Sequence, residues 1–229
     1  MPGNREIFAA AMNQADSLRW DRQWGEAASQ YQRALEEFPA DTSARRGMAH
    51  CYMQTRQWEA ALAEYQRVLE RDAANVIALA KVAELYVILQ RDKEAFQGYL
   101  VLGDYYAEDA QSGRAEAAWQ KATQLSFVEP GPHERLGKHF SSKHDYTSAV
   151  REYLAAAQGY VHQGDFAQAR QQCEAALQIN PEHEQAQKLL AHLVESLSGS
   201  STAKGMVREG LAAYSILTLP EFSEGGVPL

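Results

Sequence analysis

Residues 164–181 read GDFAQARQQCEAALQINP, and the architecture of the chain follows from the spacing within them. In this segment Ala169 is followed after four residues by Cys173 and after three more by Ala176. The same pairing of an alanine with a larger core-type residue occurs six times, at Ala27/Tyr31, Ala61/Tyr65, Ala95/Tyr99, Ala115/Trp119, Ala149/Tyr153 and Ala169/Cys173. Self-similarity at a spacing of about 20 to 50 residues indicates a repeat architecture.

The first two copies define a repeat of 34 residues, covering residues 8–41 and 42–75. Repeat positions 8, 11, 17, 20, 24 and 27 hold Ala15, Leu18, Trp24, Ala27, Tyr31 and Ala34 in the first copy, and Ala49, Tyr52, Trp58, Ala61, Tyr65 and Val68 in the second. Each copy contains two segments of helical periodicity joined by a short polar segment, which predicts a helix-turn-helix hairpin of helices A and B. Small residues at positions 8 and 20 let the two helices approach, and larger ones at 11 and 24 fill the grooves beside them.

This pattern resembles the tetratricopeptide repeat family, whose signature runs W-x2-L-G-x2-Y, then A-x3-F, then P. The resemblance covers roughly residues 8–194, and its best copy is residues 164–181, with matches at Gly164, Asp165, Phe166, Ala169, Ala176 and Pro181. It implies an all-α solenoid of about eleven helices arranged as hairpins, plus one helix in the C-terminal tail. Pro39, Pro130 and Pro181 are expected in the connections between helices.

The period shortens at two places. The third unit begins at residue 76, yet Gly103 follows Ala83 after only 20 residues. One long helix over residues 92–109 is therefore expected to serve as helix B of one hairpin and helix A of the next. The same event recurs 54 residues later, which predicts a three-helix super-repeat over 76–129 and 130–183 and a break in the regular alternation of helices.

The chain is expected to divide into a repeat domain, residues 1–197, and a tail, residues 198–229. A closing helix over residues 182–197 is followed by a flexible linker at residues 198–201. Beyond it, helical spacing relates Met206, Val207, Leu211 and Tyr214. The tail could be disordered, lie in the chain's own groove, dock onto a neighbouring copy, or act as a recognition peptide.

Composition narrows the class of partner. The formal charge of −8 argues against nucleic acid and against an anionic membrane surface, which both select clustered Lys and Arg. No secretory signal and no run of 18 apolar residues is found. Cys51 and Cys173 are expected to be buried, reduced thiols. We therefore expect a soluble, cytoplasmic protein without cofactor.

A partner-binding groove is expected on helix A of the first three units, at positions 2, 5, 9, 12 and 13, if the family geometry applies. Its candidate residues are Met12, Asp16, Arg19, Trp20, Arg46, His50, Met53, Lys81, Glu84 and Ile88. A mixture of Trp, Met and both signs of charge suits a peptide. Alternatively, Trp20 packs beside Trp24, the methionines fill the core, and Arg46 and Glu84 are solvated helix surface.

The family's carboxylate clamp, which grips a C-terminal carboxylate, is not expected here. At the matching positions the chain has Met12, Asp16, Gly47, Ile77 and Lys81, and only Lys81 keeps the required charge.

Metal binding and catalysis are also not expected. His133, His139 and His144 lie within twelve residues, but spacings of six and five turn successive imidazoles about 120–140° apart on a helix, so surface histidines are the expectation. No phosphate loop, H-E-x-x-H, G-x-S-x-G or Cys-x-x-Cys motif occurs. The chain is expected to be a non-catalytic adaptor for a protein or peptide, or alternatively a self-associating structural protein whose tail docks in its own or a neighbouring groove.

Overall fold

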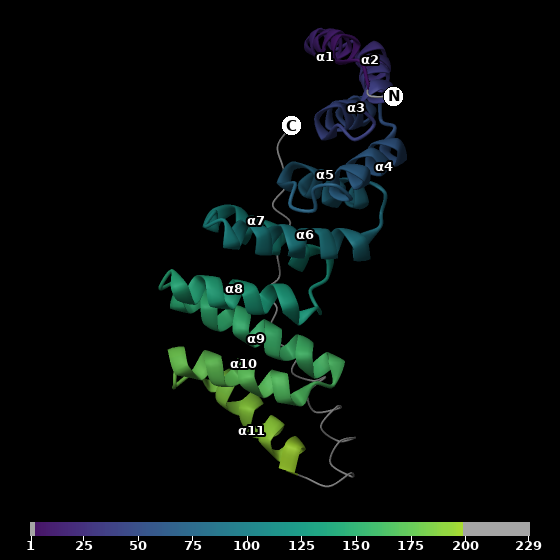
Figure 1. The fold of residues 1–229 in the computed structure, drawn as a ribbon. Coiled ribbons are helices and arrows are strands. Elements are labelled where there is room, and N and C mark those ends of the chain that lie inside the picture. The colour runs from purple at the N-terminus through teal and green to yellow at the C-terminus, as the bar shows by residue number, and fades with distance from the viewer. Residues whose placement is uncertain (1–2, 199–229) are drawn as a thin grey trace, which may run out of the picture. The chain divides into compact units, whose positions relative to one another are not determined.

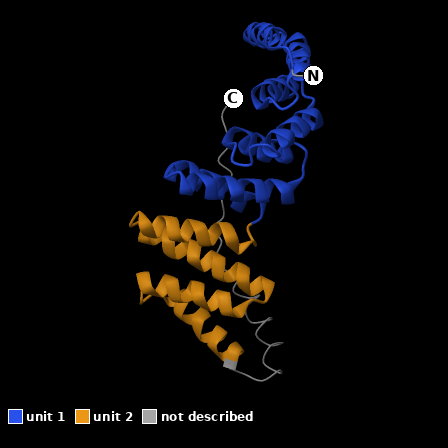
Figure 2. Ribbon diagram, viewed as in Figure 1, with its two compact units in different colours: residues 1–126 blue, residues 127–229 orange. Residues whose placement is uncertain are grey.

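The computed structural model describes residues 3–198, which form eleven α-helices without any strand. The chain divides into two compact units, residues 1–126 and 127–229 (Figure 2). The first unit contains α1 (Arg5–Trp20), α2 (Trp24–Glu37), α3 (Thr42–Gln54), α4 (Trp58–Leu69), α5 (Val76–Ile88), α6 (Asp92–Glu108) and α7 (Ser112–Leu125). The described part of the second contains α8 (Pro130–Ser142), α9 (Tyr146–Gln163), α10 (Phe166–Ile179) and α11 (Glu184–Ser198).

Within each unit every helix packs against the next one along the chain (Figure 1). The two long helices predicted from the shortened spacing are present, α6 over Asp92–Glu108 and α9 over Tyr146–Gln163. These two have 17 and 18 residues, while the other helices have 12 to 16. The break in helix alternation stays a prediction, and the tail features predicted over residues 199–229 lie outside the described residues.

The six repeat alanines are buried where helices pack against each other, as predicted. Ala27, Ala61, Ala95, Ala115, Ala149 and Ala169 are all 0% exposed. The larger partners four residues later are buried too, from Tyr31 in α2 to Cys173 in α10. At these contacts any additional methyl group would have to displace a neighbouring helix, because protein interiors are close-packed.

Side-chain caps lie at the N-termini of α1, α3 and α5, the first three helices A. The side chains of Asn4, Asp41 and Asn75 accept hydrogen bonds from backbone N–H groups in the first turns of α1, α3 and α5. Such caps satisfy donors that a helix start leaves without a carbonyl partner. By contrast, Pro130, expected in a connection, is the first residue of α8, where its missing N–H costs no helical hydrogen bond.

A feature absent from our sequence expectations is the turn of each hairpin. Position 15 has a left-handed backbone conformation in all six hairpins, with positive φ at Arg22, Arg56, Gln90, Ala110, His144 and Gly164. In each turn the following N–H donates to the carbonyl of position 11, as Gln23 N–H does to Leu18 O at 2.9 Å and Gln111 N–H to Tyr106 O at 2.8 Å. This pairing is the Schellman motif, which favours glycine at the left-handed residue. Only one of the six positions is glycine.

Replacing Ala110 by glycine should therefore stabilise the first unit by about 1 kcal/mol, although glycine in a helix interior destabilises by a similar amount. The methyl group of Ala110 is strained at φ 55°, and glycine removes that strain. Urea unfolding followed by circular dichroism would measure the change. Ala117→Gly, at an exposed interior position of α7, is the control and should destabilise. A loss of stability at both positions would contradict the role assigned to the turn.

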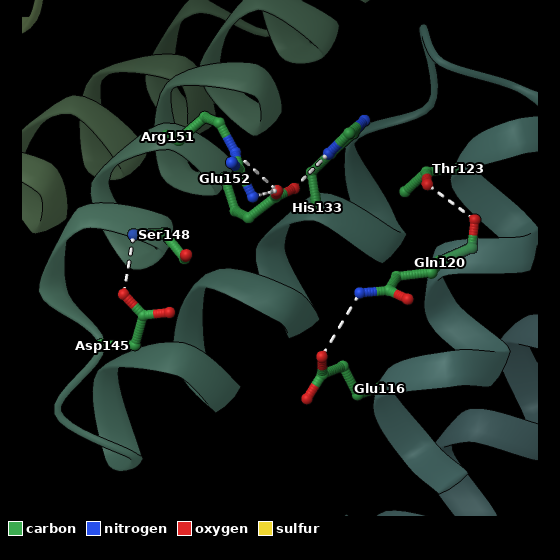
Figure 3. A network of polar contacts seen from close by, with 8 residues as sticks. All are labelled: Glu116, Gln120, Thr123, His133, Asp145, Ser148, Arg151 and Glu152. Atoms are coloured by element: carbon green, nitrogen blue, oxygen red, sulfur yellow. Dashed lines mark hydrogen bonds and ion pairs between the residues drawn. The ribbon is translucent and has the colours of Figure 1, made fainter. Parts of the chain in front are cut away.

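Two buried contacts, an arginine–glutamate ion pair and a histidine–glutamate hydrogen bond, connect helices A and B at the same repeat positions, 4 and 23. Arg45 Nη1 in α3 lies 2.7 Å from Glu64 Oε2 in α4, and His133 Nδ1 in α8 lies 2.8 Å from Glu152 Oε2 in α9. Figure 3 shows the second pair, with Arg151 also reaching Glu152. The expectation of surface histidines is wrong for His133, which is 3% exposed, because its ring is enclosed between Glu152 and the Phe127 ring.

Both cysteines are free and buried, as expected. Burial raises the pKa of the Cys51 thiol to about 11 and that of Cys173 to about 12. Both thiols therefore stay protonated near neutral pH, which leaves them unreactive. None of the helices in residues 3–198 is long and apolar enough to cross a lipid bilayer.

Candidate functional site

The ten candidate residues all belong to the first unit and lie on three helix A elements, α1, α3 and α5. Residues three or four apart on a helix share a face, which groups Met12, Asp16 and Arg19 on α1, and Arg46, His50 and Met53 on α3. On α5 the same spacing groups Lys81, Glu84 and Ile88. We call this set of ten residues the α1–α3–α5 face.

His50 links the three helices electrostatically. Its pKa is lowered by burial, then by the positive charges of Arg19 on α1 and Lys81 on α5. Its ring also makes an edge-to-face contact with Trp24, with ring centroids 5.7 Å apart. A histidine whose charged form is disfavoured from both sides stays neutral near pH 7.

The pKa of His50 should therefore rise when Arg19 is replaced by glutamine, and rise less with Lys81→Gln. Removing either cation removes a repulsion that disfavours the protonated ring. The chemical shift of the His50 Hε1 proton, followed by NMR from pH 4 to 9, measures this. Arg33→Gln, an exposed position on α2, is the matched control and should leave the titration unchanged. An unaltered His50 pKa in all three variants would show that the charges of Arg19 on α1 and Lys81 on α5 do not act on this ring.

The two carboxylates of the face are both engaged within the protein. Asp16 Oδ1 accepts a hydrogen bond from the Tyr31 hydroxyl at 2.6 Å and lies 3.3 Å from Arg19 Nη2. Glu84 Oε2 lies 2.7 Å from Lys81 Nζ. Two carboxylates and two cations on this face therefore compensate each other.

Arg46 is different. Its Nε atom is buried without a hydrogen-bond partner, and no carboxylate of the described residues lies within ion-pair distance of its guanidinium. Its charge is felt by Tyr65 of α4, whose pKa is raised to about 12 by burial and then by Glu84, with Arg46 opposing the rise. The expectation of a simply solvated helix surface is thus wrong for Arg46, since part of its polar group has lost contact with water.

Apolar side chains add to the face. Trp20, at the end of α1, is 83% exposed. The alternative that Trp20 packs beside Trp24 is therefore wrong. Ile88, at the end of α5, and its neighbour Val87 are exposed as well. Met12 and Met53 are half-buried and pack against the hydrophobic clusters of the first unit, as the alternative reading had it.

Sequence reasoning missed Tyr31 and Tyr65, which come from helices B and reach the polar groups of this face. For Tyr31 the signal was an acidic residue 15 positions before an aromatic one, whereas Tyr65 has His50 at that spacing. The same spacing relates Asp16 to Tyr31 and Asp104 to Trp119, where Trp119 Nε1 donates to Asp104 Oδ1 at 3.1 Å. It also relates Glu84 to Tyr99, whose pKa is raised by burial and by that carboxylate.

Internal contacts occupy three of the five positions of the carboxylate clamp, Asp16, Gly47 and Lys81, while Ile77 is exposed. The Tyr31 ring lies over Gly47 so closely that a Cβ there would overlap it, and Lys81 pairs with Glu84. The three histidines of residues 133–144 also have separate surroundings. His133 contacts Glu152, His139 contacts the Phe140 ring, and His144 lies in the turn after α8 beside Tyr146.

Family models described as tetratricopeptide repeat match residues 21–86 and residues 150–193. No curated protein sequence matches. Among solved structures, the chain is similar to the Arabidopsis OM64 TPR domain, at 19% identity over 53% of this chain and 98% of that one, with a TM-score of 0.47. It is also similar to MamA protein, at 16% identity over 94% of this chain and 99% of that one, with a TM-score of 0.40. A third similar structure is YrrB, described as a TPR protein with an unusual peptide-binding site, at 20% identity over 70% of this chain and 97% of that one, with a TM-score of 0.32.

Proposed function

We propose that the chain, in which residues 21–86 and 150–193 match tetratricopeptide repeat family models, is an adaptor that binds a protein or peptide partner on the α1–α3–α5 face, because such repeats generally mediate protein–protein interactions. The observation that carries this proposal is that three successive helices A bring exposed apolar side chains, Trp20 and Ile88, together with half-buried charged side chains. Trp20 is almost fully exposed, and large exposed aromatic residues are enriched in protein interfaces.

The surroundings of the face support binding more than chemistry. The pKa of its histidine is lowered by burial and then by the neighbouring cations, its carboxylates are held by internal partners, and the pKa of the nearest thiol, Cys51, is raised by burial. General acid–base or nucleophilic catalysis needs groups whose protonation is matched to the operating pH and that can reach a substrate. The residues of this face serve as contacts instead.

The test uses crosslinking and mass spectrometry in native cells to identify the partner, followed by binding measurements with that partner in purified form. A triple variant, Trp20→Ala, Arg46→Ala and Lys81→Ala, should lose the crosslinks and weaken binding at least about 100-fold, since interface anchors contribute about 2 kcal/mol or more each.

The control triple variant is Arg33→Ala, Lys93→Ala and Tyr146→Ala, which removes two exposed cations and one exposed aromatic residue from other surfaces. It should bind as the parent protein does. Circular dichroism should show equal helicity for both variants. Retained binding by the first triple variant, or equal losses in both, would move the site away from the α1–α3–α5 face.

A further inference from the structure

The charge balance of the α1–α3–α5 face leaves one cation over. Asp16 is held by Tyr31 and Arg19, and Glu84 is held by Lys81. Arg46 stands between these pairs on the middle helix with no carboxylate of its own. In a chain whose formal charge is −8, a surplus positive charge on a half-buried guanidinium beside exposed apolar side chains favours an acidic partner.

The guanidinium of Arg46 also has unused hydrogen-bonding capacity. Its Nε is buried without an acceptor and is closed to an external partner, whereas Nη1 and Nη2 are not buried and make no hydrogen bond within residues 3–198. Arginine presents its N–H groups as a planar fork that matches a carboxylate with two parallel hydrogen bonds. An Asp or Glu side chain from outside would accept hydrogen bonds from Nη1 and Nη2 and would supply the missing negative charge.

The number of unpaired cations on the α1–α3–α5 face favours a carboxylate over a phosphate as the ligand of Arg46. A phosphate monoester carries nearly two negative charges and is usually bound by a cluster of arginines. Here Arg19 and Lys81 are already paired, and His50 is neutral. A single unpaired guanidinium matches a single carboxylate.

The apolar part of the face sets the second requirement. Trp20, Val87 and Ile88 are exposed at the C-terminal ends of α1 and α5, while Arg46 lies near the beginning of α3. From Arg46 to the end of α3 is about 12 Å at 1.5 Å per residue. A partner that uses both parts therefore needs an acidic residue and a large apolar residue a few positions apart.

We infer that the partner presents an internal acidic–apolar segment, in which an Asp or Glu side chain pairs with Arg46 and a large apolar side chain contacts Trp20 or the pair Val87 and Ile88. This inference rests on the proposed function and specifies its ligand. The segment is read through a side-chain carboxylate and does not need to be a C-terminus, because Gly47 and Ile77 cannot supply the further donors of a C-terminal clamp.

The test selects binders from a random 12-residue peptide display library with the full chain. The enriched peptides are made N-acetylated, C-amidated and fluorescently labelled, and their affinities are measured by anisotropy. The enriched sequences should share one Asp or Glu with a large apolar residue near it. Replacing that acidic residue by its amide should weaken binding about tenfold, which equals about 1.4 kcal/mol.

A double-mutant cycle then assigns the contact. Arg46→Ala should weaken binding of the acidic peptide about tenfold and should abolish the difference between acid and amide peptides, while Arg46→Lys should lose less. Arg33→Ala is the control and should change neither affinity. If Arg46→Ala still discriminates acid from amide, the carboxylate binds elsewhere and the inference is wrong.

The remaining outcomes separate this inference from the proposed function. If the enriched peptides are neutral and bind the parent protein but not the Trp20, Arg46 and Lys81 triple variant, the proposed function is supported and the acidic ligand is overturned. Peptides indifferent to the triple variant would overturn both. A large gain in affinity after removal of residues 198–229 would show that the chain's own tail occupies the face, and would overturn an external partner as its resident ligand.

Discussion

Replacing Trp119 by alanine should lower the free energy of unfolding of the first unit by about 3–5 kcal/mol. Trp119 is 5% exposed, and its ring fills the space over Gly103 at the crossing of α6 and α7. The indole also donates to Asp104. Alanine would leave a cavity that Gly103 cannot fill, and would remove the hydrogen bond at the same time.

Urea unfolding and hydrogen exchange at α6 and α7 would measure this loss. Trp20→Ala is the matched control within the same unit, since Trp20 is exposed, and should change stability by less than about 0.5 kcal/mol. A second substitution sharpens the test. Gly103→Ala should destabilise the parent protein because its Cβ would overlap the indole, and should be tolerated better beside Trp119→Ala. Independent effects of the two substitutions would contradict this packing.

Replacing Glu64 by alanine should destabilise the first unit by about 3 kcal/mol. Glu64 is 6% exposed and accepts from Arg45, whose side chain is itself mostly buried, and from Arg67. After the substitution Arg45 keeps its bond to the Pro39 carbonyl but loses the carboxylate that balances its charge. An uncompensated charge at this burial is the source of the expected loss.

Glu94→Ala is the control, because Glu94 forms an exposed ion pair with Arg91 within one helical turn. It should cost less than about 1 kcal/mol, as exposed pairs generally do. Removing both buried charges, by Arg45→Met with Glu64→Leu, should restore most of the stability, since an apolar pair of similar size needs no charge compensation. If the double substitution is no better than Glu64→Ala, the loss comes from packing and not from the charge.

The packing of the hairpins was predictable because its requirement repeats. Ala27 and Ala61 each need to be small, and Tyr31 and Tyr65 each need to be large, for the same reason at each crossing. A steric condition that recurs at a fixed spacing is visible in one sequence, and even the long helices α6 and α9 could be inferred from the shortened spacing. The left-handed turns were missed because five of the six lack the glycine that would have marked them.

The candidate site was predictable only as a set of positions. Helical spacing placed Arg19, Arg46 and Lys81 on the expected faces, and an acidic residue three positions away, Asp16 or Glu84, marks Arg19 and Lys81 as paired. The sequence does not reveal that Arg46, which has no acidic residue three or four positions away, also lacks a partner on another helix and has a buried Nε. Likewise, His133 looked like a surface residue until Glu152, 19 residues away, was found against it.

The order of small and large residues along the chain was sufficient to determine an all-α repeat, because the hairpin contacts recur at a fixed spacing, as the contact of Gly103 with Trp119 does at Gly137 with Tyr153. The tertiary structure alone decided the polar contacts between helices, such as Arg45 with Glu64 and His133 with Glu152. Such contacts need side chains from different helices to meet within about 4 Å, and small changes in helix placement or rotamer make or break them without altering the repeat.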